Sequence, residues 1–393
     1  MKYDSFELQE VCSFIDYRGK TPPKTASGIP LITAKIIKNG QILPPQEYIA
    51  ESYYSEWMRR GIPKKGAIVL TTEAPLGEVA QIDTDKKLAF AQRVIILEPD
   101  ERYLVPDYLL YALQDVTLKE RIHAKATGTT VLGIKSAELK KVQIDLPSVV
   151  MQRKISSILK DIDRKIRCNQ TVNDNLEQQA AAYFQELFVA NANPNWKVGT
   201  ISDLGTVTGG STPSKAKPEY YTDNGIAWIT PKDLSINKSK FISHGETDIT
   251  ELGLKNSSAS IMPEGTVLFS SRAPIGYIAI SNGEVTTNQG FKSVVPKPEI
   301  GTAFVYFFLK NNLPTIEGAA SGSTFKEVSG STMKNVPAVI PDTGTLAKFN
   351  DFCSPFFEKQ KNLEQENQHL AFLRDTLLPK LMSGELNVSN IQL

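Results

Sequence analysis

The chain has few cysteines and no long hydrophobic run, and each shortage excludes a class of protein. Its 393 residues contain three cysteines, widely separated at Cys12, Cys168 and Cys353. An odd, scattered set argues against a disulfide framework or a paired-cysteine metal site, and it favours a reducing cytoplasm. The longest dense apolar stretch, FVYFFL (304–309), is far shorter than a membrane span. The polar start MKYDSFELQE lacks the apolar core of a secretory signal, so we expect no targeting segment there.

An excess of charge and a recognisable catalytic motif are missing as well. The 44 basic and 43 acidic residues give a net charge of +1 at pH 7, whereas a compact nucleic-acid binder usually has a clear excess of Lys and Arg. Net charge alone therefore gives no argument for a DNA partner. The histidines His123, His244 and His369 do not have a metal-ligand spacing such as HExxH. We find no GxSxG motif and no distinctive carboxylate pair, so the sequence predicts no catalytic site and no metal site.

Two short motifs partly resemble ligand-binding loops. RGKTPP (18–23) contains the Gly-Lys-Thr end of a phosphate-binding loop, but Phe14 stands where a glycine is needed and Pro22-Pro23 replaces the helix start. NPNW (193–196) is similar to the Asn-Pro-Pro-aromatic loop of amino-methyltransferases, but no Gly-rich cofactor loop accompanies it. We interpret the first as a proline-fixed turn and the second as a linker turn between a helix and the next domain.

What the sequence does contain is an internal repeat. VLTTEAPLGEVAQI (69–82) recurs 199 positions later as LFSSRAPIGYIAIS (268–281), with Glu73 replaced by Arg272. Four further segments match in the same order, at offsets of 191 to 197 residues: RGKTPP with GGSTPS (209–214), GIPLITAK (28–35) with GIAWITPK (225–232), AQRV (91–94) with NQGF (288–291), and ATGTTVLGIKSAELKKVQIDLP (126–147) with ASGSTFKEVSGSTMKNVPAVIP (320–341). Two copies are too few for a solenoid and suit a pseudo-dimer within one chain.

Each copy divides into a domain of mixed character and a long helix. The first part has short β-like runs such as AIVLT and TVLFS, separated by Gly, Pro and Asn. The last part has the four-and-three spacing of a coiled-coil heptad. We predict an α+β fold of two homologous mixed α/β domains separated by two long antiparallel coiled-coil helices, with a pseudo-two-fold repeat. The predicted segments are a first domain over 1–147, a helix over 148–190, a second domain over 191–341, and a second helix with its tail over 342–393.

The heptads predict which helix residues face the partner helix. On the first helix the predicted seam contains Ile155, Leu159, Ile162, Ile166, Asn169, Asn173 and Leu176. On the second it contains Phe356, Leu363, Asn367, Leu370 and Leu377. Symmetric alignment would place Asn169 opposite Asn367, and a buried polar pair fixes register. Pro355 should kink or restart the second helix, and Pro379 should end its regular part. A rod of ~40 residues would be ~60 Å long, as expected for a ruler between two domains.

Polar and basic residues on domain loops are the candidates for contact with DNA. Arg binds guanine, Asn and Gln bind adenine, and Lys mostly binds phosphate, although for any single residue the plain alternative is a solvated surface charge. The candidates in the first copy are Arg18, Lys20, Lys24, Lys35, Lys38 and Arg93. Those in the second copy are Lys215, Lys217, Lys232, Lys238, Lys240, Arg272, Asn288, Gln289 and Lys292. Glu73 would accept from a cytosine amino group or pair with a neighbouring lysine.

The order and duplication of these segments resemble the specificity (S) subunit of type I restriction-modification systems. The resemblance covers essentially the whole chain. It depends on GGSTPS, GIAWITPKDL, SSRAPIGYIAI followed by TTNQGFKSVVP, ASGST before the helix, and the C-terminal LLPKLMSGEL. The first copy departs from these motifs, with LITAKIIKNG, TTEAPLG and AFAQRV at the matching places. The contact residues of the first copy are therefore less well defined than those of the second.

The resemblance implies a function and a set of partners. Each domain would be a target-recognition domain that binds one half of a bipartite, asymmetric site in double-stranded DNA, and the helices would set the spacer. The subunit itself would be non-catalytic and cytoplasmic, with no cofactor of its own and no membrane partner. Two modification subunits would methylate adenine with S-adenosylmethionine, and restriction subunits would use ATP and Mg. Such partners would supply part of the electrostatic grip on DNA.

Two other functions are the alternatives to this reading. A stand-alone DNA methyltransferase would need a cofactor loop and an intact methyltransfer motif, and neither is found. A purely structural coiled-coil adaptor that binds protein rather than DNA is the other alternative.

Overall fold

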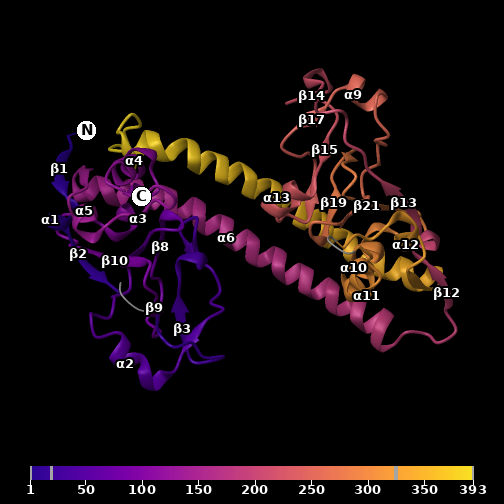
Figure 1. The fold of residues 1–393 in the computed structure, drawn as a ribbon, viewed down its shortest axis with the longest axis horizontal. Helices are drawn as coiled ribbons and strands as arrows, with labels where there is room; N and C mark the ends of the chain where they lie inside the picture. Colours follow the sequence, from indigo (N-terminus) through magenta and orange to yellow (C-terminus); the bar gives the residue numbers. More distant parts are fainter. Residues whose placement is uncertain (1, 18–20, 323–325, 392–393) are drawn as a thin grey trace. The chain divides into compact units, whose positions relative to one another are not determined.

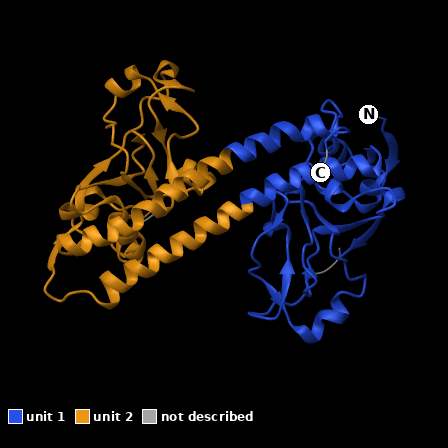
Figure 2. Ribbon diagram, turned by 180° about the vertical axis from the view of Figure 1, so that it is seen from behind, with its two compact units in different colours: residues 1–166, 369–393 blue, residues 167–368 orange. Residues whose placement is uncertain are grey.

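The computed structural model describes residues 2–17, 21–322 and 326–391. Contacts divide the chain into two compact units: unit 1 comprises residues 1–166 and 369–393, and unit 2 comprises residues 167–368 (Figure 2). Each unit contains its own mixed α/β domain and a segment of each of two long helices, α6 (Val149–Gln185) and α13 (Thr343–Met382) (Figure 1). The predicted α+β class, with two related domains and two long helices, is confirmed.

The central sheets of the two units have matching topologies. The unit 1 sheet is antiparallel and has the order β2 (Cys12–Asp16), β10 (Val94–Pro99), β7 (Ile68–Thr72), β8 (Leu76–Gln81). The unit 2 sheet has the order β13 (Gly205–Gly209), β21 (Lys292–Pro296), β18 (Val267–Ser271), β19 (Ile275–Ser281), β16 (Phe241–Ile242), in which only β16 runs parallel to its neighbour. The sequence repeat is therefore a repeat of strand order.

Smaller elements surround each sheet. In unit 1 they are β1 (Asp4–Glu7), α1 (Leu8–Val11), β3 (Ile29–Ile32), η1 (Ala34–Ile36), β4 (Ile37–Lys38), β5 (Gln41–Ile42), β6 (Tyr48–Ile49), η2 (Glu51–Tyr53), α2 (Tyr54–Trp57), β9 (Ala89–Phe90), α3 (Pro106–Ala112), α4 (Val116–Ala124), α5 (Ser136–Lys140) and β11 (Gln143–Leu146). In unit 2 they are η3 (Glu186–Ala190), β12 (Lys197–Thr200), α7 (Ile201–Leu204), η4 (Pro218–Tyr220), β14 (Tyr221–Thr222), β15 (Trp228–Ile229), α8 (Pro231–Ile236), β17 (Asp248–Ile249), α9 (Glu251–Lys255), β20 (Thr286–Thr287), α10 (Thr302–Asn311), α11 (Leu313–Gly318), α12 (Gly330–Lys334) and β22 (Pro337–Ile340). The NPNW segment forms a turn between η3 and β12, as predicted.

Both faces of each central sheet are buried, because alternate residues of a strand point to opposite faces. In β7, Ile68 and Leu70 pack with α3, α4 and the long helices, whereas Val69 packs with the cluster around Phe90. In β18, Val267 and Phe269 likewise pack with α10 and the long helices, and Leu268 packs on the opposite side. Both units therefore have two cores, one that includes the long helices and one that supports the loops.

The repeated Ala-Pro-(Leu/Ile)-Gly segment, residues 74–77 and 273–276, forms the same turn in both units. It connects β7 to β8 and β18 to β19, with cis peptide bonds at Ala74–Pro75 and Ala273–Pro274. The two alanines have positive φ angles of 51° and 50°, and Gly77 and Gly276 have φ angles of 87° and 95°. Positive φ favours glycine, which explains why the glycine recurs together with the proline. The two copies of this segment therefore have the same backbone conformation.

The second helix neither restarts at Pro355 nor ends at Pro379, contrary to two of the expectations from the sequence. The α13 helix runs from Thr343 to Met382 without interruption, through Pro355 and Pro379. A proline removes one helical hydrogen bond, but tertiary packing on both sides offsets this loss. Near Pro355 the Phe352 ring packs on the Tyr183 ring of α6, with centroids 4.6 Å apart. Near Pro379, Leu381 is buried in the unit 1 core.

The long helices pack antiparallel, and polar residues lie within their seam. In unit 2, Asn169 is only 2% exposed and its Nδ2 donates to Asn367 Oδ1 at 2.9 Å and to Glu366 at 2.8 Å. One turn further along α6, the backbone oxygen of Asn173 accepts from Gln360 at 3.0 Å. Residue numbers rise along α6 as they fall along α13, so the pairing is antiparallel. The amides meet at the register that the heptads predict.

The remaining seam residues are buried or half-buried within their own units. Ile155 and Leu159 in unit 1, and Leu363 in unit 2, are buried. The half-buried members are Ile162, Ile166, Leu370 and Leu377 in unit 1 and Asn173, Leu176 and Phe356 in unit 2. The seam is therefore apolar at its ends and polar around Asn169.

The Asn169–Asn367 pair predicts a trade between stability and alignment. Replacing both by leucine should raise the free energy of unfolding by on the order of 1 kcal/mol, because an apolar pair avoids burying the Asn169 amide and partly burying that of Asn367. The same change should relax the register. Denaturant unfolding measures the first effect, and cross-linking of an Asn173→Cys/Gln360→Cys pair in a Cys168→Ser background measures the second. Strong stabilisation with alignment fully retained would contradict a register role for the asparagines.

Candidate nucleic-acid interface

The GGSTPS loop of unit 2 is held tightly against the segment that follows β20. A Cβ on Gly210 would lie 2.1 Å from the Asn288 carbonyl oxygen, so only glycine fits there. The Ser211 amide donates to the Thr287 oxygen at 2.9 Å, and the Trp228 indole donates to the Ser211 oxygen at 3.0 Å. These contacts explain why the loop motif, the tryptophan and TTNQGF occur together in the sequence.

A cavity of about 610 Å³ lies between this loop, α8 and the Asn288–Gln289 turn. Its lining includes four of the predicted contact residues, Lys215, Lys232, Asn288 and Gln289. Tyr221 and Trp228 add aromatic surface, with ring centroids 5.8 Å apart. Residues that are distant in sequence thus form one polar, partly aromatic hollow. Thr212, Tyr221 and Trp228 were not predicted from the sequence, although Thr212 lies within GGSTPS and Trp228 within the repeated GIAWITPK.

The carboxylates of the cavity are already engaged within the protein. Asp233 caps α8: its Oδ2 accepts from the Thr230 amide at 2.7 Å and from the Thr230 hydroxyl at 2.6 Å. Its Oδ1 accepts from the Glu246 amide at 2.9 Å. The Glu246 carboxylate pairs with Lys232 at 2.5 Å. A capping box fixes the start of α8, so Lys232 is presented from a defined position.

The other unit 2 candidates lie outside the lining of this cavity. Lys217 is exposed and donates to the Tyr220 hydroxyl at 3.1 Å, and Lys238 lies 4.7 Å from the Tyr277 ring centroid. Arg272 and Lys292 both pair with Glu327, at 3.2 and 3.6 Å. Glu327 therefore forms ion pairs with two cationic side chains. It was not among the residues predicted from the sequence.

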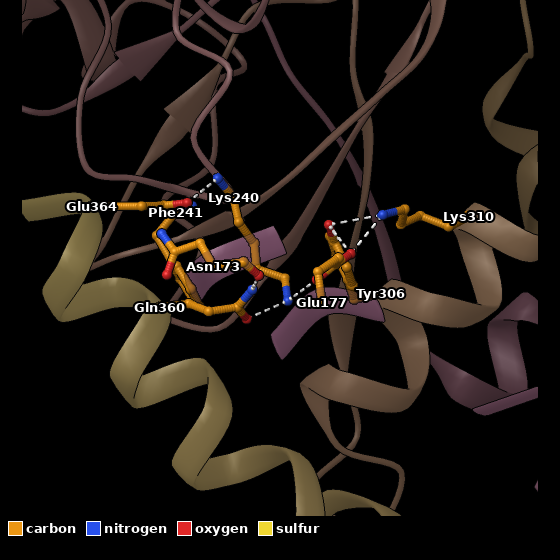
Figure 3. Close-up of polar contacts among 8 residues, drawn as sticks. All are labelled: Asn173, Glu177, Lys240, Phe241, Tyr306, Lys310, Gln360 and Glu364. Carbon is orange, nitrogen blue, oxygen red and sulfur yellow. Dashed lines mark hydrogen bonds and ion pairs between the residues drawn. The ribbon is translucent and has the colours of Figure 1, made fainter. Parts of the chain in front are cut away.

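Lys240 was predicted to contact DNA, and the structure places it in the interior of unit 2 instead (Figure 3). It is 8% exposed, and its ammonium group pairs with Glu177 of α6 at 2.6 Å and donates to Gln360 of α13 at 2.9 Å. The same group lies 3.7 Å from the Phe357 ring centroid, a cation–π contact. Lys240 is therefore a structural residue that joins the domain to both helices.

The surrounding groups complete this buried cluster. The Glu364 carboxylate accepts from the backbone amides of Lys240 and Phe241 at 2.8 and 3.0 Å (Figure 3). Lys310 also pairs with Glu177, at 2.6 Å. Burial lowers the pKa of Lys240, and the attraction of Glu177 opposes that shift. Burial alone would raise the pKa of Glu177, but Lys240 and Lys310 outweigh it and hold that pKa below its ordinary value. Lys240 and Glu177 therefore each stabilise the charged form of the other.

In unit 1 a smaller hollow of about 340 Å³ lies beside the repeated turn. Its lining includes Glu73, Gln92, Arg93 and Lys135. Arg93, a predicted contact residue, pairs with Glu73 at 2.9 Å. Of the other candidates, Lys24 pairs with Glu47 at 2.9 Å, Lys35 and Lys38 are exposed, and Arg18 and Lys20 lie outside the described residues.

Ion pairs explain why Glu73 of the first copy is replaced by Arg272 in the second. Glu73 pairs with Arg93 in unit 1, and Arg272 pairs with Glu327 in unit 2. Each unit therefore keeps an ion pair beside the same turn, but the acid and the base come from different segments. The partner of Glu73 is an arginine and not the lysine considered from the sequence.

The described residues contain neither a metal-binding cluster nor a membrane-spanning helix. Within residues 2–17, 21–322 and 326–391, no group of three or more His, Cys, Asp or Glu side chains could hold a metal ion. No helix in that part of the chain is long and apolar enough to cross a membrane.

Comparisons with known proteins converge on one family. A family model described as "Type I restriction modification DNA specificity domain" matches residues 1–178 and again 193–371. The MjaIX specificity subunit of Methanocaldococcus jannaschii, a type I restriction enzyme subunit, is 39% identical over 189 residues; this alignment covers 48% of the present chain but only 44% of that subunit. The HindI specificity subunit of Haemophilus influenzae is 23% identical, with 82% of this chain and 87% of that subunit aligned. The crystal structure of the S subunit from M. genitalium has the same fold, with a TM-score of 0.61 at 18% identity, covering 97% of this chain and 96% of that one.

The buried position of Lys240 predicts a stability effect. Lys240→Met should lower the free energy of unfolding by about 3 kcal/mol, because it leaves a buried carboxylate with one partner fewer. Lys238→Met is the matched control: that side chain is exposed, and its loss should change stability by less than about 0.5 kcal/mol. Denaturant unfolding of the whole chain measures both. A Lys240→Met protein of unchanged stability whose DNA binding depends less steeply on salt would return Lys240 to the interface.

Proposed function

The chain belongs to the family of type I restriction-modification DNA specificity domains, and on that premise we propose that it is the DNA-recognition subunit of such a system. Each unit binds one half of a bipartite, asymmetric target in double-stranded DNA. The observation that carries this proposal is the repeat itself: two domains with one strand order, one turn conformation and one connection to the long helices. Two related domains in one chain are suited to a DNA site that has two separate halves.

The differences between the units support two different half-sites. At the position where unit 2 has Asn288 and Gln289, unit 1 has Ala91 and Gln92. The ion pairs beside the repeated turn differ too, as Glu73–Arg93 and Arg272–Glu327. A shared backbone with different donors and acceptors is suited to base edges that differ. Identical half-sites would need no such divergence.

The long helices set the spacer between the half-sites. Their seam has one register, held by Asn169 with Asn367 and by Gln360 with the Asn173 backbone. A coiled coil whose register is fixed by buried amides has a defined length. The distance between half-sites then depends on helix length, and the base sequence depends on the domains.

Catalysis belongs to partner subunits in this proposal. Two modification subunits use S-adenosylmethionine to methylate adenine, and restriction subunits use ATP and Mg; this chain binds none of these cofactors and works in the cytoplasm, where those subunits meet DNA. The side chains of Phe372 and Leu373 on α13 are 74% and 45% exposed, and we infer that they are among the residues that a modification subunit contacts. The near-neutral net charge of +1 fits a subunit that shares its grip on DNA with partners.

Methylome sequencing tests this function. Deleting the gene should remove one bipartite N6-methyladenine motif from the genome, and reintroducing the gene should restore that motif alone. A tagged copy of the full chain should co-purify with the methyltransferase of the same system. An unchanged methylome would contradict DNA recognition. Methyltransferase activity in the isolated chain would show instead that the chain is a stand-alone enzyme.

A further inference from the structure

Asn288 lines the unit 2 cavity and has a fixed side-chain orientation. Its backbone amide donates to the Ile229 oxygen at 3.0 Å, and its side-chain Oδ1 accepts from the Gly290 amide at 2.8 Å. A backbone N–H can be satisfied only by the oxygen of the carboxamide, so the amide orientation follows from chemistry. A Cβ on Gly290 would lie 2.9 Å from Asn288 Oδ1 and 3.0 Å from Pro231 Cγ, so this turn is closely packed.

The nitrogen of the same carboxamide remains available. Among the described residues, Asn288 Nδ2 has no hydrogen-bond partner, and the side chain is half-buried in the lining of the cavity. Asn288 therefore offers Nδ2 as a donor without a partner, whereas one of the two lone pairs of Oδ1 is already taken by the Gly290 amide. An Asn that contacts adenine in two places uses both atoms of the carboxamide, so here it would have to share Oδ1 between Gly290 and the base. A contact through Nδ2 alone needs no such sharing.

The rest of the cavity is also rich in donors. The Gln289 oxygen accepts from the Thr212 hydroxyl, which leaves its nitrogen as a donor. Lys215 is exposed at the edge of the cavity. Of the carboxylates, Asp233 accepts three hydrogen bonds within the protein, and Glu246 is paired with Lys232 at the exposed surface. The side chains of the lining that remain for a base to contact without breaking an ion pair include the donors of Asn288, Gln289 and Lys215.

Guanine is the base whose exposed edge matches such a site. In the major groove it presents two neighbouring acceptors, N7 and O6, whereas adenine presents an acceptor beside a donor and thymine a single acceptor beside a methyl group. We propose that Asn288 is a specificity-determining residue that donates through Nδ2 to guanine, and that the half-site read by unit 2 contains guanine at the contacted position. This inference rests on the proposed function and names the base class that the unit selects.

An isosteric substitution tests the proposal. Asn288→Asp keeps an oxygen to accept from the Gly290 amide but replaces the Nδ2 donor by an acceptor. Asn193→Asp is the matched control, because Asn193 Oδ1 also accepts from an amide two residues ahead, at 2.9 Å, and its side chain lies outside the cavity lining. Both changes add the same charge. The measurement is the base preference of the assembled methyltransferase complex, read from a DNA library with both half-sites randomised.

We expect the Asn288→Asp complex to lose about tenfold or more of its preference for guanine at one position of one half-site, as a lost base contact does. Cytosine, whose amino group can donate to the new carboxylate, should gain at that position. The other half-site and the Asn193→Asp complex should keep the wild-type preferences. Unchanged guanine preference, or an affinity loss spread evenly over all sequences, would overturn the proposal.

The wild-type complex separates this failure from a wider one. If it shows two half-sites and Asn288→Asp changes neither, then only the role of Asn288 is wrong. If the wild-type complex selects no half-site in this library, the proposed DNA-recognition function itself is wrong. Thermal unfolding of both variants verifies that the Gly290 contact and the fold are retained.

Discussion

The antiparallel packing of α6 on α13 is the constraint on which the rest of the structure depends. Each domain builds part of its core from these helices: Ile155, Leu159 and Leu381 in unit 1, and Phe184 and Phe349 in unit 2. A shift of the helix register would therefore disturb both cores. An apolar seam alone tolerates such a shift, and the buried Asn169–Asn367 contact makes one alignment preferable. The polar seam residues lower stability and give a unique geometry in return.

A single scaffold supports two different surfaces. The repeated turn has nearly the same backbone angles in both units, with Ala74 and Ala273 at φ 51° and 50°. Beside it, Glu73 pairs with Arg93 and Arg272 pairs with Glu327. An ion pair lies next to the turn in both units, but the acid and the base come from different segments. The charged residues thus differ while the backbone is the same, as the proposed recognition of two different half-sites requires.

The features predictable from sequence are those written in local periodicity or in duplication. The heptads predicted the helices and the Asn169–Asn367 register, and the repeated segments predicted two related domains, because each pattern involves residues near one another in sequence or aligned by the repeat. The role of Lys240 could not be predicted, since its partners Glu177 and Gln360 lie 63 and 120 residues away in the sequence. Asp233 is a different case: two of its three hydrogen bonds come from Thr230, three residues away, and form a capping box, which is a local pattern that the sequence could have revealed. The expected restart of the helix at Pro355 was wrong because the unfavourable effect of proline within a helix is weaker than the aromatic packing around it.

In the proposed function, the helices determine the spacing of the half-sites and the domains determine the base sequence. Inserting one heptad after Ile166 and another after Gln368 places both insertions at the boundary between the compact units and leaves the internal contacts of each unit intact. Seven residues add ~10 Å of helix, which corresponds to about three base pairs of DNA. Methylome sequencing of a strain with this variant should show both half-sites unchanged and a spacer longer by about that amount. An altered half-site sequence, or an unchanged spacer in an active complex, would contradict the account.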